Sequence, residues 1–275
     1  MEIVKSKNPI GVIDSGVGGL TVLVRLIEVM PDQPFLYIAD QAWCPYGPRA
    51  PKEVCSRIFS IVEYLLREGC KFIVLACNTA TAAAVNSLRL HYNIPFVGME
   101  PAVKPAALTS QTHHVGVLAT AGTFSGALFQ RTAAACLRYA QLHLAVGEGL
   151  VELVESGQAD SYEADRILRK LLAPLLEQNI DRLVLGCTHY PLLRSSLERV
   201  LPPCVKILDP APAIARQSLR IERAMCSLSV SRTTTELELL STKNNANLLE
   251  FARKVFAFYN LPFPTLSTEH YVDLS

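Results

Sequence analysis

Two stretches of similar chemistry, LACNTA at residues 75–80 and LGCTHY at residues 185–190, decide the expected architecture. Each follows a short apolar run, FIV at 72–74 and LV at 183–184, and each leads into a segment of helical character. In both places a cysteine stands where a buried strand would end and a helix begin. Two thiols in equivalent settings predict one site with two opposed faces.

The composition predicts a full hydrophobic core and a small ligand. The chain has 275 residues, of which 50% are hydrophobic and 19% charged, enough for one large domain or two of about 100–150 residues. Its formal net charge is +1 and its Lys and Arg residues are dispersed. A chain without a basic field gives no reason to expect nucleic acid or an anionic membrane as partner.

The eight cysteines are scattered, without a C-x-x-C pair or a His/Cys cluster of metal spacing. This usage is typical of reduced intracellular thiols and predicts no metal site. Residues 1–9 lack the apolar core of a signal peptide, and no apolar run approaches the roughly 20 residues of a membrane span. We therefore expect a cytoplasmic protein. Six of the cysteines are interpreted as inert packing: Cys44, Cys55, Cys70, Cys136, Cys204 and Cys226.

Strand-like and helix-like segments alternate along the chain. Strands are expected near residues 10–13, 35–39, 72–76, 94–97, 115–119, 142–146, 183–186, 205–208 and 236–240. Helices are expected near 20–30, 54–65, 79–90, 125–140, 150–155, 162–178, 192–200, 213–225 and 246–259. This alternation predicts an α/β protein with mostly parallel sheets flanked by helices. Residues 261–275 are expected to form a loosely held tail.

The chain shows signs of an internal duplication. The segment GVID at 11–14 has a counterpart 105 residues later, at Gly116, and Cys187 follows Cys77 by 110 residues. Two offsets that nearly agree predict two pseudo-symmetric lobes. The elements after Asp209 are too few for a third domain, so the expected lobes are residues 1–100 with 210–275, and residues 101–209.

Polar residues follow several of the predicted strands. Because ligands of parallel sheets bind outside the carboxyl ends of the strands, a cleft between the lobes is the expected site. The residues placed there are Asp14, Asp40, Cys77, Thr120 and Cys187. Each of the two cysteines precedes a helix N-terminus, which is expected to lower the thiol pKa from about 8.5.

Two loops have both a functional and a structural interpretation. The segment DSGVGG at 14–19 can bind an anion through its N–H groups, but it lacks a P-loop lysine and the full G-x-G-x-x-G spacing, so a tight turn is equally consistent. The segment CPYGP at 44–48 is stiff turn chemistry that can form the rim of a ligand site or an ordinary surface turn.

The two cysteines suggest a reaction class. One cysteine with a histidine and a carboxylate would indicate a nucleophile. Two thiols on opposite walls suit a base that removes a proton and an acid that returns one to the other face. That chemistry is racemisation or epimerisation.

Four motifs occur in an order that resembles glutamate racemase, within the aspartate/glutamate racemase superfamily. They are GVIDSGVGGLT at 11–21, Asp40 with PYG at 45–47, ACNTAT at 76–81 and GCTHYP at 186–191. The resemblance spans nearly the whole chain. It implies cofactor-independent interconversion of L- and D-glutamate, supplying D-glutamate for peptidoglycan, in a homodimer of two-lobed subunits.

The same resemblance implies individual roles. Cys77 deprotonates one enantiomer and Cys187 the other. Asp14 and Asp40 match the acidic residues beside the first thiol, whereas His189 and Glu155 match those beside the second. The residues matched to substrate contacts are Asp14, Ser15, Pro45, Tyr46, Gly47, Cys77, Asn78, Thr79, Thr120, Cys187, Thr188 and His189, with Thr123 as a further candidate.

Several alternatives stay open at this point. Family members often carry a cysteine shortly before the LVE stretch, and residues 146–149 contain none. The substrate could be aspartate or another amino acid; the chain could also be a non-catalytic binder of small anions or a thiol sensor. Taken alone, His189 could be a core histidine, Glu155 an exposed helix residue and Asp40 a turn cap.

Overall fold

The computed structural model describes residues 8–225, 235–243 and 247–274. Cys226 and residue 246, where one helix was expected to begin, lie outside these ranges. The strands are β1 Ile10–Asp14, β2 Phe35–Ala39, β3 Phe72–Leu75, β4 Phe96–Gly98, β5 His114–Ala119, β6 Gln141–Val146, β7 Arg182–Gly186, β8 Lys206–Leu208, β9 Glu236–Ser241 and β10 Thr265–Tyr271. The helices are α1 Leu20–Val29, α2 Pro51–Arg67, α3 Asn78–His91, α4 Val103–Thr109, α5 Ala121–Phe124, α6 Ala127–Cys136, α7 Leu150–Glu155, α8 Tyr162–Leu176, the 3₁₀ helix η1 Tyr190–Leu193, α9 Arg194–Val200, α10 Ala211–Met225 and α11 Leu248–Phe258.

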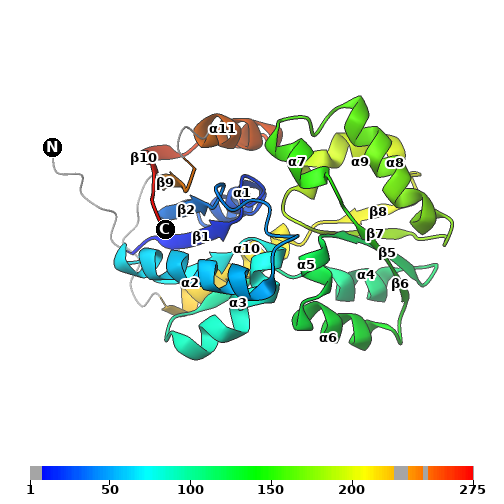
Figure 1. Ribbon diagram of the computed structural model, residues 1–275, viewed down its shortest axis with the longest axis horizontal. Coiled ribbons are helices and arrows are strands. Elements are labelled where there is room, and N and C mark those ends of the chain that lie inside the picture. Colours follow the sequence, from blue (N-terminus) through cyan, green and yellow to red (C-terminus); the bar gives the residue numbers. More distant parts are fainter. Residues whose placement is uncertain (1–7, 226–234, 244–246, 275) are drawn as a thin grey trace.

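The strands form two separate parallel sheets, which lie side by side in Figure 1. One sheet has six strands in the order β10-β9-β2-β1-β3-β4, and the other has four in the order β6-β5-β7-β8. Central strands such as β1 and β2 are buried at every residue, as expected for strands covered by helices on both faces. The prediction of a two-lobed α/β fold is confirmed, whereas the limits of the lobes at 100/101 and 209/210 stay a prediction.

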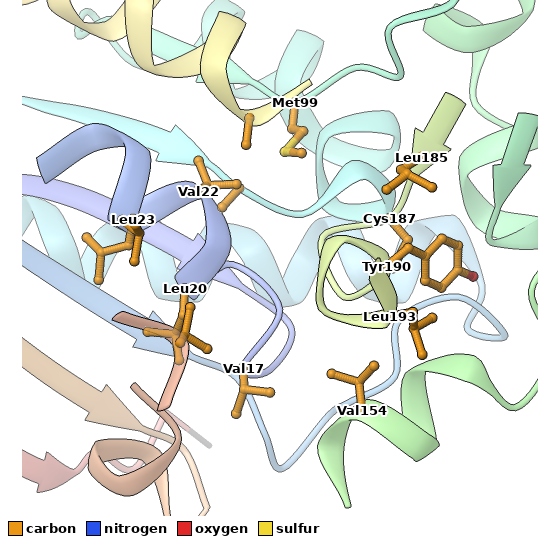
Figure 2. Packing of buried hydrophobic residues seen from close by; sticks show 14 of the residues in the cluster. Val17, Leu20, Val22, Leu23, Met99, Val154, Leu185, Cys187, Tyr190 and Leu193 are labelled. Atoms are coloured by element: carbon orange, nitrogen blue, oxygen red, sulfur yellow. The ribbon is translucent and has the colours of Figure 1, made fainter. Parts of the chain in front are cut away.

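The two lobes share part of their hydrophobic core. Val17 and Leu20, beside β1, belong to the same cluster as Val154, Tyr190 and Leu193 of the other lobe. Figure 2 shows Val17 facing Val154, with Tyr190 and Leu193 beyond it. Since each fully buried apolar side chain of this size contributes about 1.5–3 kcal/mol, the loop after β1 is firmly packed against the second lobe.

The prediction of a loose C-terminal tail is wrong. Strand β10 pairs in parallel with β9 and forms the edge of the six-stranded sheet, while Val272 is buried. A parallel pair needs a long crossover, and α11 supplies it. The guanidinium of Arg57 also donates to the carbonyl oxygen of Leu274 at 2.6 Å.

Two further local predictions differ from the structure. The helix expected over 125–140 is α6, which is shorter because the extended backbone of Gly126 precedes its first residue, Ala127. The short helix α5 before it, capped by the Thr120 side chain, was not predicted. Helix α4 was not predicted. No helix within the described ranges combines the length and apolarity needed to cross a bilayer.

Candidate active site

The carboxyl ends of strands from both sheets bring the two cysteines into one buried region. Cys77 follows β3 and is the N-cap of α3, whereas Cys187 follows β7 and precedes η1. Both side chains are buried. They are close enough for a charge on Cys187 to raise the pKa of Cys77, after the larger influences of burial, Asp14 and the N–H of Ala80.

Cys77 is almost fully buried. Its Sγ accepts the N–H of Ala80 at 3.5 Å and lies 3.9 Å from Ser15 Oγ. Burial raises the pKa of Cys77 to about 12, and the neighbouring Asp14 adds to this effect. The expectation of a lowered pKa is therefore wrong for Cys77: the helix N–H acts in the expected direction, but desolvation of the thiolate is the larger effect.

Asp14 connects the two cysteine stretches. Its Oδ2 accepts the N–H of Gly16 at 2.9 Å, and its Oδ1 accepts the hydroxyl of Thr188 at 3.0 Å. Burial raises the pKa of Asp14, while the charge of His189 and these hydrogen bonds oppose the increase. The carboxyl group next to Cys77 is thus held by the residue that follows Cys187.

A hydrogen-bonded pair lies beside Cys187. His189 Nδ1 lies 3.7 Å from Cys187 Sγ, and His189 Nε2 lies 2.7 Å from Glu155 Oε1. Burial alone would lower the pKa of His189, but its hydrogen bonds to Cys187 and Glu155 raise it well above 6.5. Burial would raise the pKa of Glu155, but His189 and the N–H of Val17 lower it. Opposite shifts favour an imidazolium–carboxylate pair.

The glycine loop after β1 is packed against this pair. A Cβ at Gly18 would lie 2.4 Å from His189 Nδ1, and one at Gly16 would lie 2.0 Å from Glu155 Oε1. The N–H of Gly16 donates to Asp14, and that of Val17 donates to Glu155 Oε1 at 2.7 Å. The loop therefore serves close approach of the two lobes, and two of its N–H groups already bind carboxylates of the protein.

Asp40 lies in a second polar network. Its carboxylate accepts the hydroxyl of Tyr46 at 2.5 Å and that of Thr242 at 2.7 Å. Arg57 binds it with two nitrogens, Nε at 3.0 Å and Nη2 at 2.8 Å. Asp40 thereby anchors the loop that carries Pro45, Tyr46 and Gly47.

Arg57 and Thr242 were missed from the sequence. Arg57 lies between Val54 and Ile58 on the buried face of α2, and a lone charged residue at an apolar position of a helix is a signal that could have found it. Thr242 follows β9, about 200 residues away from Asp40, and carries no such local signal.

Threonine side chains line the boundary between the lobes. Thr79 Oγ1 lies 2.8 Å from Thr120 Oγ1, which lies 2.9 Å from Thr123 Oγ1. Gly47 belongs to the same region, because a Cβ there would lie 3.2 Å from that of Thr120. Asn78 Oδ1 is buried and has no hydrogen-bond donor among the described residues. Such an acceptor costs about 1–3 kcal/mol unless a ligand supplies a donor.

The remaining cysteines do not all fit the packing interpretation. Cys44 lies with its Sγ 3.7 Å from Glu155 Oε1, and Cys204 is exposed. Cys44, Glu155 and His189 place one donor atom each within 4.8 Å of one another, which makes them a potential metal-binding group of the described residues.

The fold and this arrangement define a class of protein. The chain belongs to the Asp/Glu/Hydantoin racemase family, whose model matches residues 10–218. Among its relatives is a glutamate racemase of Herpetosiphon aurantiacus, 43% identical over 87% of this chain and 94% of that protein. The glutamate racemase of Pseudomonas aeruginosa strain PAO1 is 44% identical over 82% of this chain and 86% of that protein.

Solved structures show the same likeness. Glutamate racemase isoform RacE1 of Bacillus anthracis superposes with a TM-score of 0.82 and 31% identity, covering 97% of this chain and 98% of that one. The Escherichia coli glutamate racemase, in complex with L-glutamate and the activator UDP-MurNAc-Ala, superposes with a TM-score of 0.83 and 28% identity, covering 98% and 99%.

Proposed function

We propose that this chain interconverts L- and D-glutamate with two thiols and without a cofactor. The observation that carries the proposal is the placement of Cys77 and Cys187 at corresponding strand ends of two lobes, buried in one region and coupled through the Asp14–Thr188 hydrogen bond. The similarity to curated glutamate racemases supports glutamate as the substrate.

The proton balance of the reaction needs both cysteines. A thiolate on one face takes the Cα proton, so that an S–H bond forms as the C–H bond breaks. The thiol on the other face then gives its proton to the carbanion, and the roles are reversed for the other enantiomer. Cys77 begins the reaction of one enantiomer and Cys187 that of the other.

The surroundings offer partners for each charged group of glutamate. Asp14 and the unsatisfied Asn78 Oδ1 can accept hydrogen bonds from the ammonium group. Hydroxyls of Ser15, Thr79 and Thr120 can donate to the carboxylates, which also stabilises the charge that develops near Cα. Asp40 enters the proposal as a positioning residue, because its carboxylate is held by Tyr46, Arg57 and Thr242.

The cellular setting is part of the same proposal. The scattered cysteines support a cytoplasmic location. The family resemblance supports a homodimer that supplies D-glutamate for peptidoglycan. Sedimentation of the purified protein tests the dimer.

Circular dichroism of L- and D-glutamate incubated with the protein, without pyridoxal phosphate, tests the activity, together with deuterium uptake at Cα from heavy water. Cys77→Ser and Cys187→Ser should each lower turnover about 10²–10⁴-fold, the contribution of a positioned acid or base. Full activity in either variant would contradict the two-thiol mechanism. A panel with aspartate and other amino acids tests the substrate, and glutamate binding without Cα exchange would indicate a binding module instead.

A further inference from the structure

Three donor atoms of different chemistry meet beside the Cys187 half of the site. Cys44 lies in the loop after β2, Glu155 ends α7 and His189 follows β7, so both lobes contribute. The Sγ of Cys44 is 3.7 Å from Glu155 Oε1, which is 2.7 Å from His189 Nε2. The proposed proton transfers involve Cys77 and Cys187, with the His189–Glu155 pair beside Cys187, and give Cys44 no task.

The three donor atoms lie within 4.8 Å of one another, which is close to the spacing of ligands around a tetrahedral cation. Zinc binds sulfur at about 2.3 Å and nitrogen or oxygen at about 2.0–2.2 Å, which places tetrahedral donors about 3.4–3.6 Å apart. The distance between Cys44 and Glu155 already has this size. The distance between His189 and Glu155 must open by roughly 0.7 Å to reach it, and the carboxylate can turn because its side chain is 20% exposed.

The donor set also selects the cation. A thiolate and an imidazole prefer Zn²⁺ or Co²⁺, whereas Mg²⁺ and Ca²⁺ prefer oxygen ligands. A cavity of about 310 Å³ borders both Cys44 and Glu155 and offers a route that does not pass Cys77. Three protein ligands leave the fourth position to water, as in open zinc sites.

We propose that Cys44, Glu155 and His189 bind a divalent cation of the Zn²⁺ class, and that the bound cation inhibits the enzyme. As the metal bonds form, the thiol proton of Cys44 and the proton between His189 and Glu155 pass to solvent. His189 and Glu155 then no longer assist proton transfer at Cys187. The cation site stands on the donor geometry, whereas the inhibition rests on the proposed function.

Titration of the full chain with Co²⁺ tests the site, because a cobalt–thiolate bond absorbs in the near ultraviolet. We expect a band that saturates at one equivalent and is lost in Cys44→Ser and in Cys44→Ala. The matched control is Cys55→Ala, another half-buried cysteine, which should keep the band. A band that persists without Cys44, or that disappears in Cys187→Ser, would overturn the assignment, as would the absence of any band.

Inhibition of racemisation by Zn²⁺ tests the second part of the proposal, that the bound cation inhibits the enzyme. Cys44→Ala should turn over glutamate like the unaltered protein and should need at least about tenfold more Zn²⁺ for half inhibition, since even the loss of an outer-shell partner of a metal site costs about 10–100-fold in affinity. Equal sensitivity of both proteins would overturn the inhibitory role. If the protein binds Co²⁺ through Cys44 but does not racemise glutamate, the proposed function fails and the cation site remains.

Discussion

The surroundings of Cys77 and Cys187 differ although their places in the two lobes correspond. Cys77 caps a helix of 14 residues and has Asp14 as its charged neighbour, and burial raises its pKa to about 12. Cys187 precedes a 3₁₀ helix of four residues and faces the His189–Glu155 pair. Duplication therefore explains the position of the thiols, whereas their acid–base chemistry depends on neighbours that the two lobes do not share.

The largest expected effect comes from removing one helper at a time. Asp14→Asn and His189→Asn should each lower kcat/KM about 10²–10⁴-fold, because each removes a group that assists one thiol. Turnover of both enantiomers, measured by circular dichroism, checks this. The Thr188→Val variant keeps both helpers and loses only the contacts of one hydroxyl, with Asp14 at 3.0 Å and with His189 Nδ1 at 3.5 Å, so it is the milder control.

The direction of turnover sharpens this test. Since the two enantiomers have equal free energies, kcat/KM must be the same in both directions at every pH, so the asymmetry belongs in kcat and KM separately. We expect one of the two variants to lower kcat mainly for L-glutamate and the other to lower it mainly for D-glutamate. We also expect the unaltered enzyme to have different pH profiles of kcat for the two enantiomers. Superimposable kcat profiles would show that the two environments are equivalent in catalysis.

The next effect concerns the ion pair beneath the Tyr46 loop. Arg57→Met leaves the buried carboxylate of Asp40 without its guanidinium and should lower the free energy of unfolding by about 3–5 kcal/mol, measured by urea denaturation. The control is Arg166→Met, whose partner Glu163 is exposed, and we expect its unfolding midpoint to stay unchanged. A loss no greater than that of the control would mean that the Arg57–Asp40 contact does not stabilise the folded protein.

Two adjacent glycines allow the neighbours of Cys187 and of Cys77 to be disturbed separately. A Cβ at Gly18 would meet His189, whereas one at Gly19 would lie 2.4 Å from the Cβ of Asp14. Gly18→Ala and Gly19→Ala should each destabilise the protein by about 1–3 kcal/mol, the usual cost of overpacking. Gly18→Ala should lower kcat for the same enantiomer as His189→Asn does. Gly19→Ala should lower kcat for the same enantiomer as Asp14→Asn does. Wild-type behaviour of either variant would mean that the backbone yields without moving the helper.

The smallest expected effect is the pH dependence of the His189–Glu155 pair. The pKa of His189 is raised from 6.5, so its contribution to stability is complete below pH 6.5 and is lost as pH rises through the folded-state pKa. The pKa of Glu155 is lowered from 4.5, so its contribution is complete above pH 4.5 and is lost as pH falls through the folded-state pKa.

The variant Glu155→Gln should therefore differ most from the unaltered protein between about pH 4.5 and 6.5, by about 1.5 kcal/mol, a typical value for one hydrogen bond to a charged group. Unfolding midpoints measured across pH check this, with Glu163→Gln at an exposed position as the control. A difference that does not vary with pH would show that the pair is neutral.

The sequence by itself determined the two-lobed α/β class and the positions of the two cysteines. Both follow from local patterns: apolar runs of strand length, a cysteine at the strand end and a helical segment after it. Near-equal offsets between the halves added the duplication. The edge strand β10 escaped this reasoning because the edge of β9 provides its hydrogen-bond partners, and no local pattern of residues 261–275 records that edge.

Only the tertiary structure decided which side chains meet. Asp14 and Thr188 are 174 residues apart, and Asp40 and Thr242 are 202 apart, so their contacts depend on how the lobes and sheets pack. The pKa of the Cys77 thiol also depends on this packing. The position of Cys77 at the start of a helix was expected to lower that pKa. Desolvation is a property of the assembled core, and in this protein it is stronger than the effect of the helix terminus.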